Sequence, residues 1–426
     1  MDWILALLAA FNTASMATVL YDRRTKRVAP PWTRFAYSLI TTELAWLWLP
    51  TQCVLAVLLC LGGALDSGPG GIALLVLAAS WVSLANNIKK AFMAEELTEQ
   101  ALQKELGSNY RQDIAPELRQ RTENHPQARE WINPFRMQRS DVEVIKDVAY
   151  GPNGIKQQMD IYRPRHIPEE GCPVLLQIHG GAWTIGSKDT QALPLMYLMA
   201  SKGWICAAIN YRLSPSVGFP THLEDCKRAL GWIKTQGHEY GMNTDFVAVT
   251  GGSAGGHLTS LMGLTSNMPD LQKDHPNVDT SVQAVVPFYG VYDVIGKMDR
   301  TNRELFVSLL KDRVIFESPE DNPEVWDLAS PVTHIKPDLP PFMLVQGQID
   351  SLTTVAGART FHRLIKEQGN QAVYLELLGA EHAFDNIHSP RTDAVIKGVH
   401  RFLEWARSQH LKAKESEQQR HSETEG

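Results

Sequence analysis

The chain lacks the features that several functional classes require. Its 426 residues include only five cysteines, and their irregular spacing forms neither a disulfide framework nor a zinc pattern. This cysteine usage fits a reducing compartment. The formal net charge is only −6, with neither sign concentrated in the C-terminal body, so we expect no nucleic-acid partner.

Long apolar runs are confined to the first 90 residues. Three such segments cover residues 3–20, about 44–65 and 72 to about 85. A membrane-spanning helix needs about 20 apolar residues, which the second segment provides, whereas the first and third are shorter and carry polar side chains. We predict three membrane helices, with a turn at residues 66–70 between the last two, so that residues 1–90 form a transmembrane helical anchor.

Two of these assignments have alternatives. The first segment could instead be a signal peptide, although Asp2 stands where such peptides carry a basic region. The third segment could be a buried helix of a soluble domain. Trp46, Trp48 and Trp81 suit either interfacial anchoring or packing on an apolar face.

Basic residues around these segments indicate an orientation. They lie in the first connection and after the third segment, while the second connection has none: Arg23, Arg24, Lys26, Arg27, Arg34, Lys89 and Lys90. The positive-inside rule then puts the N-terminus outside and the C-terminal body in the cytoplasm. We therefore predict a multi-pass membrane protein with a cytoplasmic catalytic domain, and the loss of one helix would invert that body.

Between the anchor and the C-terminal body lies a polar, helix-rich connecting region, residues 91–139. Its acidic residues are interleaved with leucines at a spacing that suits a surface helix packed against the body or the membrane edge. At the other end of the chain, residues 411–426 are charged, polar and free of aromatic residues, which indicates a disordered tail.

Residues 140–410 alternate short strand-like runs with helix-length amphipathic stretches. The predicted strands are residues 142–150, 158–162, 173–178, 204–210, 246–250, 282–288, 342–346 and 372–377. The predicted helices fall near residues 190–202, 221–236, 254–265, 355–368 and 391–409. This alternation predicts an α/β fold with a mostly parallel eight-stranded sheet and helices on both faces. In such sheets the functional crevice lies outside the carboxyl ends of the strands.

The apolar strand within residues 246–257 ends in small residues around one serine, Ser253. A hydroxyl is a poor nucleophile, so a serine enzyme must expose it at a sharp turn, beside a base and near N–H donors. Glycines on both sides, in the pattern GGSAG at residues 251–255, suit a strained strand-to-helix elbow. Alone the pattern is a weak signal, because small-residue turns with a serine are common.

A glycine-rich loop also follows the predicted strand at residues 173–178. Successive glycines let backbone N–H groups point into a cavity without obstruction by a Cβ atom, as an oxyanion hole requires. We predict Gly181 and Ala182 as two donors and the N–H of Ala254 as the third, while Gly180 shapes the turn. The loop alone would also fit a plain strand-to-helix turn.

These motifs belong to an ordered set. The set consists of HGGAW at residues 179–183, NYRLSP at 210–215, GGSAGG at 251–256, GQID at 347–350 and EH at 381–382. In this order the motifs resemble the α/β-hydrolase family, specifically the esterase and lipase branch related to hormone-sensitive lipase, over roughly residues 140–410. The combination with a membrane segment is also similar to isoprenylcysteine methylesterases, which share a His-Gly-Gly-Ala-Trp loop.

The chain departs from the commonest pattern of that branch at two positions. Ala182 stands where a third glycine is usual, and Gly252 stands where an aspartate often precedes the serine. Because backbone N–H groups form an oxyanion hole, the first difference matters little. The second difference leaves the substrate class open.

The resemblance implies a catalytic triad in the order serine, acid, histidine. Asp350 stands at the mouth of the next-to-last strand, and His382 follows the final strand. The ring of His382 would take the Ser253 proton, while Asp350 would fix the tautomer of the ring and stabilise the imidazolium. Asp385 and His388 are the rival acid and base.

Further predictions concern residues around the site. His179 and His257 are expected to brace loops through hydrogen bonds and not to transfer protons. Arg212 and Asp225 should form a structural ion pair after the fourth strand. An apolar insertion at residues 290–330 precedes the acid strand, and it is either a cap over the serine or an ordinary helical excursion.

The sequence therefore predicts a membrane-anchored serine esterase or lipase that hydrolyses carboxylic esters, with lipid-like esters favoured because of the anchor. Water would deacylate the enzyme, and no metal or organic cofactor is implied. The same triad would serve an acyltransferase or an amidase. In a different class, a catalytically silent membrane interaction protein could retain this scaffold. No motif defines the oligomeric state.

Overall fold

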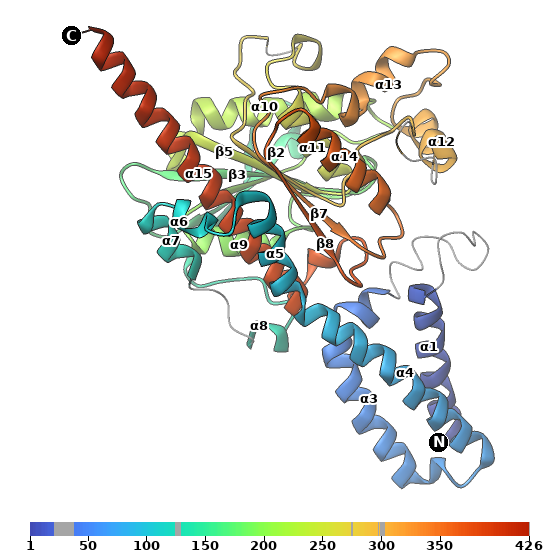
Figure 1. Cartoon of the computed structure of the whole chain (residues 1–426). Helices are drawn as coiled ribbons and strands as arrows, with labels where there is room; N and C mark the ends of the chain where they lie inside the picture. The colour runs from blue at the N-terminus through green and yellow to red at the C-terminus, as the bar shows by residue number, and fades with distance from the viewer. Residues whose placement is uncertain (21–37, 124–128, 274–275, 297, 299–302, 426) are drawn as a thin grey trace.

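The computed structural model describes residues 1–20, 38–123, 129–273, 276–296, 298 and 303–425. The first-connection residues used for the predicted orientation lie outside these ranges: Arg23, Arg24, Lys26, Arg27 and Arg34. Figure 1 shows a helical bundle at the N-terminal end of the chain joined to an α/β body, with the C-terminal helix extending away from that body.

The body is built on one eight-stranded sheet. Its strands are β1 (Val142–Ala149), β2 (Gln158–Pro164), β3 (Cys172–Ile178), β4 (Ile205–Ile209), β5 (Met242–Gly252), β6 (Ala284–Phe288), β7 (Phe342–Gly347) and β8 (Ala372–Leu377). The spatial order is β1-β2-β4-β3-β5-β6-β7-β8. Only β2 runs antiparallel to its neighbours β1 and β4, and the remaining pairs are parallel. The predicted mostly parallel sheet is confirmed, and every predicted strand overlaps an observed one.

Helices cover both faces of this sheet. Those of the connecting region and the body are α5 (Ala94–Leu106), α6 (Tyr110–Asp113), α7 (Pro116–Glu123), α8 (Arg129–Ile132), α9 (Leu193–Ser201), α10 (Thr221–Gln236), α11 (Ala254–Leu264), α12 (Arg303–Arg313), α13 (Pro323–Ala329), α14 (Val355–Glu367) and α15 (Pro390–Glu425). The predicted helix at residues 221–236 coincides with α10, and the other predicted helices overlap α9, α11, α14 and α15.

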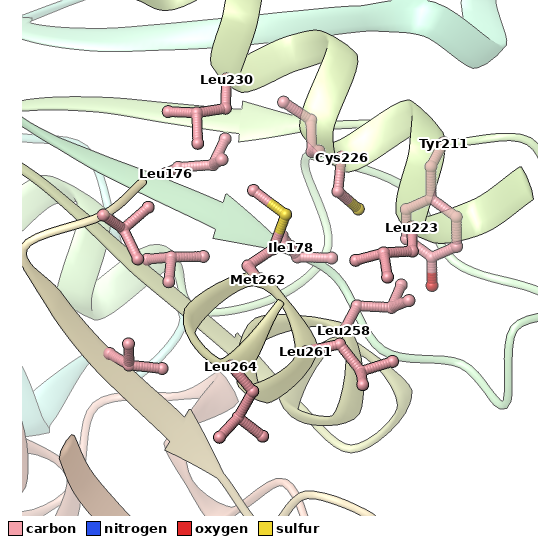
Figure 2. Packing of buried hydrophobic residues seen from close by; sticks show 14 of the residues in the cluster. Leu176, Ile178, Tyr211, Leu223, Cys226, Leu230, Leu258, Leu261, Met262 and Leu264 are labelled. Carbon is pink, nitrogen blue, oxygen red and sulfur yellow. The ribbon is translucent and has the colours of Figure 1, made fainter. Parts of the chain in front are cut away.

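Two apolar layers result because successive side chains of a strand point to opposite faces. In β3, Leu176 and Ile178 pack with α10, α11 and α14, whereas Leu175 packs with α5, α9 and α15. Figure 2 shows the first layer, where side chains from α10 and α11 such as Leu223 and Leu261 surround those of β3. Because helices cover both faces of the sheet, a site open to solvent can form only at the ends of the strands or at an outer edge of the sheet.

Within the described residues, three long helices pack together as the N-terminal bundle. They are α1 (Asp2–Leu20), α3 (Ala45–Leu59), which ends in a π-helical turn (Cys60–Ala64), and α4 (Gly68–Phe92). Two helical stretches, Ala45–Ala64 and Gly68–Leu106, are long and apolar enough to cross a membrane, while the described apolar part of α1 is shorter. Less than a third of the apolar window of each stretch is buried, so these helices do not resemble the mostly buried core helices of a soluble domain.

Polar side chains join the three helices inside the bundle. The amide of Asn12 donates to Gln52 Oε1 at 2.7 Å and to Ser80 Oγ at 2.9 Å. The indole N–H of Trp48 donates to Asn12 Oδ1, and that of Trp81 donates to Gln52 Oε1. Hydrogen bonds between such side chains hold helices together in an apolar surrounding. Trp48 and Trp81 therefore direct their polar atoms inward, which supports the packing alternative.

The C-terminal segment differs from the sequence-based expectation. Instead of a disordered tail over residues 411–426, α15 continues to Glu425. Residues 411–425 contain no glycine or proline and consist largely of lysine, glutamate, glutamine, alanine and arginine, which favour helix even where no apolar face is buried. An ion pair of 2.7 Å between Lys414 and Asp245 also ties this part of the helix to the body.

Candidate active site

Ser253 lies at a sharp turn between β5 and α11, as the small residues around it predict. Its backbone has φ 59° and ψ −120°, a conformation that is rare for residues other than glycine. The turn is tight because the neighbouring chain lies close: a Cβ atom on Gly255 would be 2.1 Å from the carbonyl oxygen of Ile178. The N–H of Ser253 donates to Phe288 O at 3.0 Å, which ties the turn to the end of β6.

The glycine-rich loop after β3 lies beside this serine. A Cβ atom on Gly180 would be 3.1 Å from the Cβ of Ser253. Gly181 and Ala182 have φ angles of 116° and 51°, so the loop follows a left-handed path. Within the described residues neither N–H has a recorded acceptor, whereas the N–H of Gly180 donates to Gln191 Oε1 at 2.7 Å. Gly180 thus shapes the loop, as predicted.

Ala254 begins α11, and the N–H groups of a first helical turn have no acceptor within their own helix. The N-terminal end of a helix also carries a partial positive charge. The N–H of Ala254 is therefore available to an anion next to Ser253, like those of Gly181 and Ala182.

Asp350 and His382 form a buried pair. Asp350 follows β7 and His382 follows β8, and the Nδ1 atom of the ring lies 2.9 Å from Asp350 Oδ2. The carboxylate also accepts hydrogen bonds from the N–H groups of Leu352 and Thr353 and from the hydroxyl of Thr353. These bonds fix the carboxylate, so the ring nitrogen facing it is held as the N–H donor.

The pair has shifted pKa values of opposite sign. Burial works to raise the pKa of Asp350, but the charge and hydrogen bond of His382 and the backbone donors outweigh it and hold the pKa below its usual value. Burial works to lower the pKa of His382, but Asp350 outweighs it and raises the pKa above the usual value. The protonated ring is thus stabilised, as a general base requires once it has accepted a proton.

Tyr289, which follows β6, lies close both to Gly252, the residue before Ser253, and to His382. The Tyr289 ring lies 4.5 Å from the His382 ring, and a Cβ atom on Gly252 would be 2.7 Å from the tyrosine ring and hydroxyl. Among the described residues the structure records no hydrogen bond between the Ser253 hydroxyl and the His382 ring. Hydrogen bonds of this kind are often long in a substrate-free site and shorten in the complex.

The sequence analysis did not predict Tyr289 as a site residue, nor its hydrogen bond to Asp385. The Tyr289 hydroxyl donates to Asp385 Oδ1, and both residues are buried. A signal was present, since Tyr289 is the first residue after β6, at the same carboxyl edge of the sheet as Ser253, Asp350 and His382. Residues at the carboxyl ends of all the parallel strands should therefore be considered together.

The rival residues have other partners. Asp385 bonds Tyr289 and has no recorded hydrogen bond to His382, while His388 Nδ1 lies 2.9 Å from Asp393 Oδ1. Together with Glu130, these last two could hold a metal ion, because their ligand atoms lie within 4.8 Å of one another. Arg139 already pairs with Glu130 at 3.1 Å, so this cluster is explained as a structural contact.

The two other histidines brace loops, as predicted. His257 lies between the Trp183 indole N–H, 3.3 Å from Nδ1, and the Ala329 carbonyl, 2.6 Å from Nε2. Nδ1 of His179 lies 2.7 Å from Gly180 O, and the His179 ring stacks on Tyr211 at 4.4 Å. Burial lowers the pKa of each histidine to about 4, so both are neutral near pH 7.

The predicted ion pair is confirmed. The Arg212 guanidinium donates to both carboxylate oxygens of Asp225, at 2.7 and 2.9 Å, and the Arg212 N–H donates to the same carboxylate. Asp225 is fully buried. The pair fixes the chain after β4, beside the loop with the candidate oxyanion donors.

The apolar insertion packs on the body near these loops. Leu310 of α12 and Trp326 of α13 are buried, and the N–H of Phe219 donates to Val314 O. Ala329, at the end of α13, bonds His257, which in turn bonds the loop after β3. The insertion thus lies against the loops that flank Ser253, a position that suits a cap.

Known proteins resemble this chain over its C-terminal body. Residues 159–365 match the BD-FAE family. The probable carboxylic ester hydrolase LipM of Mycobacterium tuberculosis is 45% identical, and the aligned part covers 63% of each chain. Esterase LipC of the same organism is 38% identical over 60% of this chain and 64% of its own length. The chain therefore spans slightly less than two thirds of these relatives.

Two further comparisons concern the expected branch and the fold. A probable isoprenylcysteine alpha-carbonyl methylesterase of Oryza sativa subsp. japonica is 26% identical over 56% of this chain and 58% of its own length. The crystal structure of esterase B from Lactobacillus rhamnosis superposes with a TM-score of 0.57 at 21% identity, covering 74% of this chain and 98% of that one. Residues 159–365 therefore match BD-FAE, a hormone-sensitive-lipase-like family, and the body has the α/β-hydrolase fold.

Proposed function

We propose that this chain is a membrane-anchored serine hydrolase that cleaves carboxylic esters. Its similarity to carboxylic ester hydrolases and esterases supports an ester as substrate. The observation that carries the proposal is the 2.9 Å hydrogen bond between Asp350 and His382, at the same edge of the sheet as the strained turn of Ser253. A nucleophile, a base and a group that orients the base are the parts that acyl transfer to serine requires.

Acylation begins when the Ser253 hydroxyl oxygen attacks the ester carbonyl carbon and its proton passes to His382 Nε2. Asp350 keeps the proton on Nδ1 and stabilises the imidazolium. The tetrahedral intermediate collapses, His382 donates the proton to the departing alcohol oxygen, and the acyl group stays on Ser253. Water then attacks this acyl-enzyme by the same proton route and releases the acid.

Charge on the carbonyl oxygen develops next to three backbone donors. The N–H groups of Gly181, Ala182 and Ala254 would donate to this oxyanion, and the fixed loop means that they need no reorganisation when the charge forms. The braces on the loop, from His257 to Trp183 and from Gln191 to Gly180, support this assignment.

Anchoring and sidedness complete the proposal. The stretches Ala45–Ala64 and Gly68–Leu106 would cross the bilayer, with α1 packed against them. The basic residues Lys89 and Lys90 lie at the end of α4 next to the body, which by the positive-inside rule favours a cytoplasmic catalytic domain. A site held beside a bilayer meets amphiphiles first, so we propose lipid-like esters as substrates.

A series of p-nitrophenyl esters tests this function. The full chain, purified in detergent, should release p-nitrophenol and acid in equal amounts, and kcat should fall by up to about 10⁶-fold in Ser253→Ala. Ser416→Ala, which changes an exposed serine on α15, is the control and should leave kcat unchanged. Equal rates for Ser253→Ala and the wild type would refute the mechanism.

The same series tests the choice of substrate. Activity should rise from acetyl toward octanoyl esters, and a maximum at acetyl with no activity at octanoyl would reject lipid-like substrates. Repeating the assay with an added alcohol or amine, and analysing the products, separates hydrolysis from transfer of the acyl group.

A further inference from the structure

Three exposed apolar residues lie where the bundle meets the body. Phe92, at the end of α4, is 54% exposed, and Ile132 and Phe135, in and after α8, are 74% and 66% exposed. We call these three residues the junction patch. Large apolar side chains so exposed, beside a bundle whose outer surface is also apolar, indicate a contact with an apolar partner.

Aromatic contacts join the patch to the bundle. The Trp131 ring in α8 lies 5.6 Å from the Phe92 ring and 6.3 Å from the ring of Trp46 at the start of α3, both in edge-to-face geometry. Figure 1 shows α8 beside the point where α4 enters the body. The patch is therefore continuous with the apolar helices and is not an isolated feature of the body.

The length of α4 indicates the depth at which this patch lies. From the exposed Ile72 to Phe92 the helix rises about 30 Å at 1.5 Å per residue, which matches the hydrocarbon thickness of a bilayer. The far end is marked by polar residues, since the Ser67 hydroxyl donates to Asp2 at 2.9 Å. Phe92 and the aromatic rings around it thus lie at the level where aromatic side chains meet the bilayer surface.

Charge next to the patch fits such a surface. Lys89 on α4 and Arg136 after α8 are both exposed and flank the apolar residues. Basic side chains beside exposed aromatic and aliphatic residues are typical of segments that bind at a bilayer interface containing anionic lipids.

Trp131 and Pro134, which lie next to the patch in the chain, contact the segment that follows the candidate base. The Trp131 indole N–H donates to Asp393 Oδ2 at 2.6 Å, and the N–H of His388, six residues after His382, donates to Pro134 O at 2.9 Å. The bundle reaches the same loop, because a Cβ atom on Gly379 would be 3.0 Å from the Lys90 side chain. The carboxyl end of β8 therefore faces the bundle.

We propose that the junction patch rests in the headgroup region of the bilayer and that ester lipids reach Ser253 from that surface. The inference rests on the proposed function and names where its substrate enters. The partner is the bilayer itself: apolar side chains of the patch bind its acyl boundary, and Lys89 and Arg136 bind anionic headgroups.

The test compares two substrates on the same full-length variants. The double variant Ile132→Ser/Phe135→Ser, reconstituted in vesicles of phosphatidylcholine and phosphatidylglycerol, is assayed with a water-soluble short-chain ester and with a diacylglycerol in the bilayer. We expect an unchanged rate on the soluble ester and a loss of about tenfold on the bilayer ester, from the lost burial of two apolar side chains. Ile155→Ser is the control, because Ile155 is 68% exposed on the body and lies outside the patch.

Other outcomes have distinct meanings. Equal loss in the Ile155 control, or wild-type rates on both substrates in the double variant, would overturn the inference while leaving the esterase proposal intact. Ile132→Trp/Phe135→Trp should keep the bilayer activity, and its failure to do so would also contradict the inference. No activity of the wild type on either ester would instead refute the proposed function.

Discussion

At residue 252 a glycine leaves room for Tyr289. A Cβ atom there would lie 2.7 Å from the tyrosine ring and hydroxyl. We expect Gly252→Ala to lower the free energy of unfolding by about 1–3 kcal/mol through overpacking and to reduce kcat, since Tyr289 contacts His382. Chemical denaturation in detergent and ester hydrolysis measure the two effects.

Two further variants test whether the effect of Gly252→Ala comes from the contact with Tyr289. Gly71→Ala adds a Cβ atom into open space and should not lower stability. In the double variant Gly252→Ala/Tyr289→Ala the two losses should be less than additive, because they concern one contact. Full additivity would show that the tyrosine is not what restricts residue 252.

The pH dependence of kcat/KM should follow His382. The ring must be neutral to accept the proton of Ser253, and Asp350 raises its pKa above the ordinary 6.5. As pH falls through this raised pKa the ring becomes charged, so kcat/KM should drop to half at a pH above 6.5. A pH–rate profile with a soluble ester measures this, and an acid limb at or below 6.5 would contradict the assignment.

Tyr289→Phe tests how the carboxylates around His382 control its pKa. These carboxylates are Asp350, after β7, and Glu381 and Asp385, on the loop after β8. Burial already raises the pKa of Asp385, and the Tyr289 hydroxyl opposes that shift. Without the hydroxyl, the pKa of Asp385 should rise further, which weakens the negative charge that helps to raise the pKa of His382. The acid limb should then move to lower pH, whereas a purely structural role would change the rate and not the limb.

At the residue scale the sequence predicts Ser253, Asp350 and His382 as site residues because each follows a predicted strand, in the triad order that the family resemblance implies. It did not identify Tyr289, although that residue ends β6 in the same way, because no motif singles out a tyrosine there. Side-chain contacts such as the Tyr289–Asp385 bond depend on how strands are ordered in space, which one sequence does not specify.

Among the elements, a buried ion pair fixes the bundle to the body. Glu43, just before α3, accepts hydrogen bonds from Arg391 and from Ser389, at the start of α15, and all three are fully buried or nearly so. Removing one partner leaves an uncompensated buried charge, so Arg391→Met should destabilise the protein by about 3–5 kcal/mol. Denaturation in detergent measures the loss.

Replacing both Glu43 and Arg391 distinguishes the effect of an unpaired buried charge from the effect of lost packing. Glu43→Leu/Arg391→Met should recover most of the stability lost in the single variant, because no unpaired charge remains. A double variant as unstable as Arg391→Met would show that the pair acts through its shape and not its charge.

In contrast to the buried pair, the end of α15 should contribute little to stability. Beyond residue 411 the helix has mostly exposed side chains, and its polar contacts with the body are also exposed: the ion pair between Lys414 and Asp245 and the hydrogen bond from Lys412 to Asp113 O. Exposed pairs contribute little to stability. Removal of residues 412–426 should therefore leave the thermal midpoint and kcat unchanged, and a clear drop in either would show that this helix has a role in the fold.

Element types were predicted well where periodicity was strong and poorly where composition was the guide. The eight strands and α10 follow from alternation and amphipathic spacing. The tail was expected to be disordered because it is charged, polar and free of aromatic residues, yet its helix-favouring residues continue α15 in the structure. The contact between Glu43 and Arg391 spans most of the chain, so no local pattern predicts it.

For the whole molecule, the arrangement shows how the apolar bundle and the α/β body of one chain are joined. The nearly continuous helix of α4 and α5 leads from the bundle onto β8 and α15, so the edge of the sheet with the candidate site is held near the bundle. Composition predicted the two parts, but not that the loop after β8 faces the bundle.

The central claim is that Ser253 is an activated nucleophile, and covalent labelling tests it most directly. The intact protein is treated with a fluorophosphonate, digested, and mapped by mass spectrometry. We predict one phosphonylated residue, Ser253, with slower labelling in Asp350→Asn and none in Ser253→Ala. Labelling at another residue, or equal labelling of Ser253→Ala and the wild type, would contradict the account.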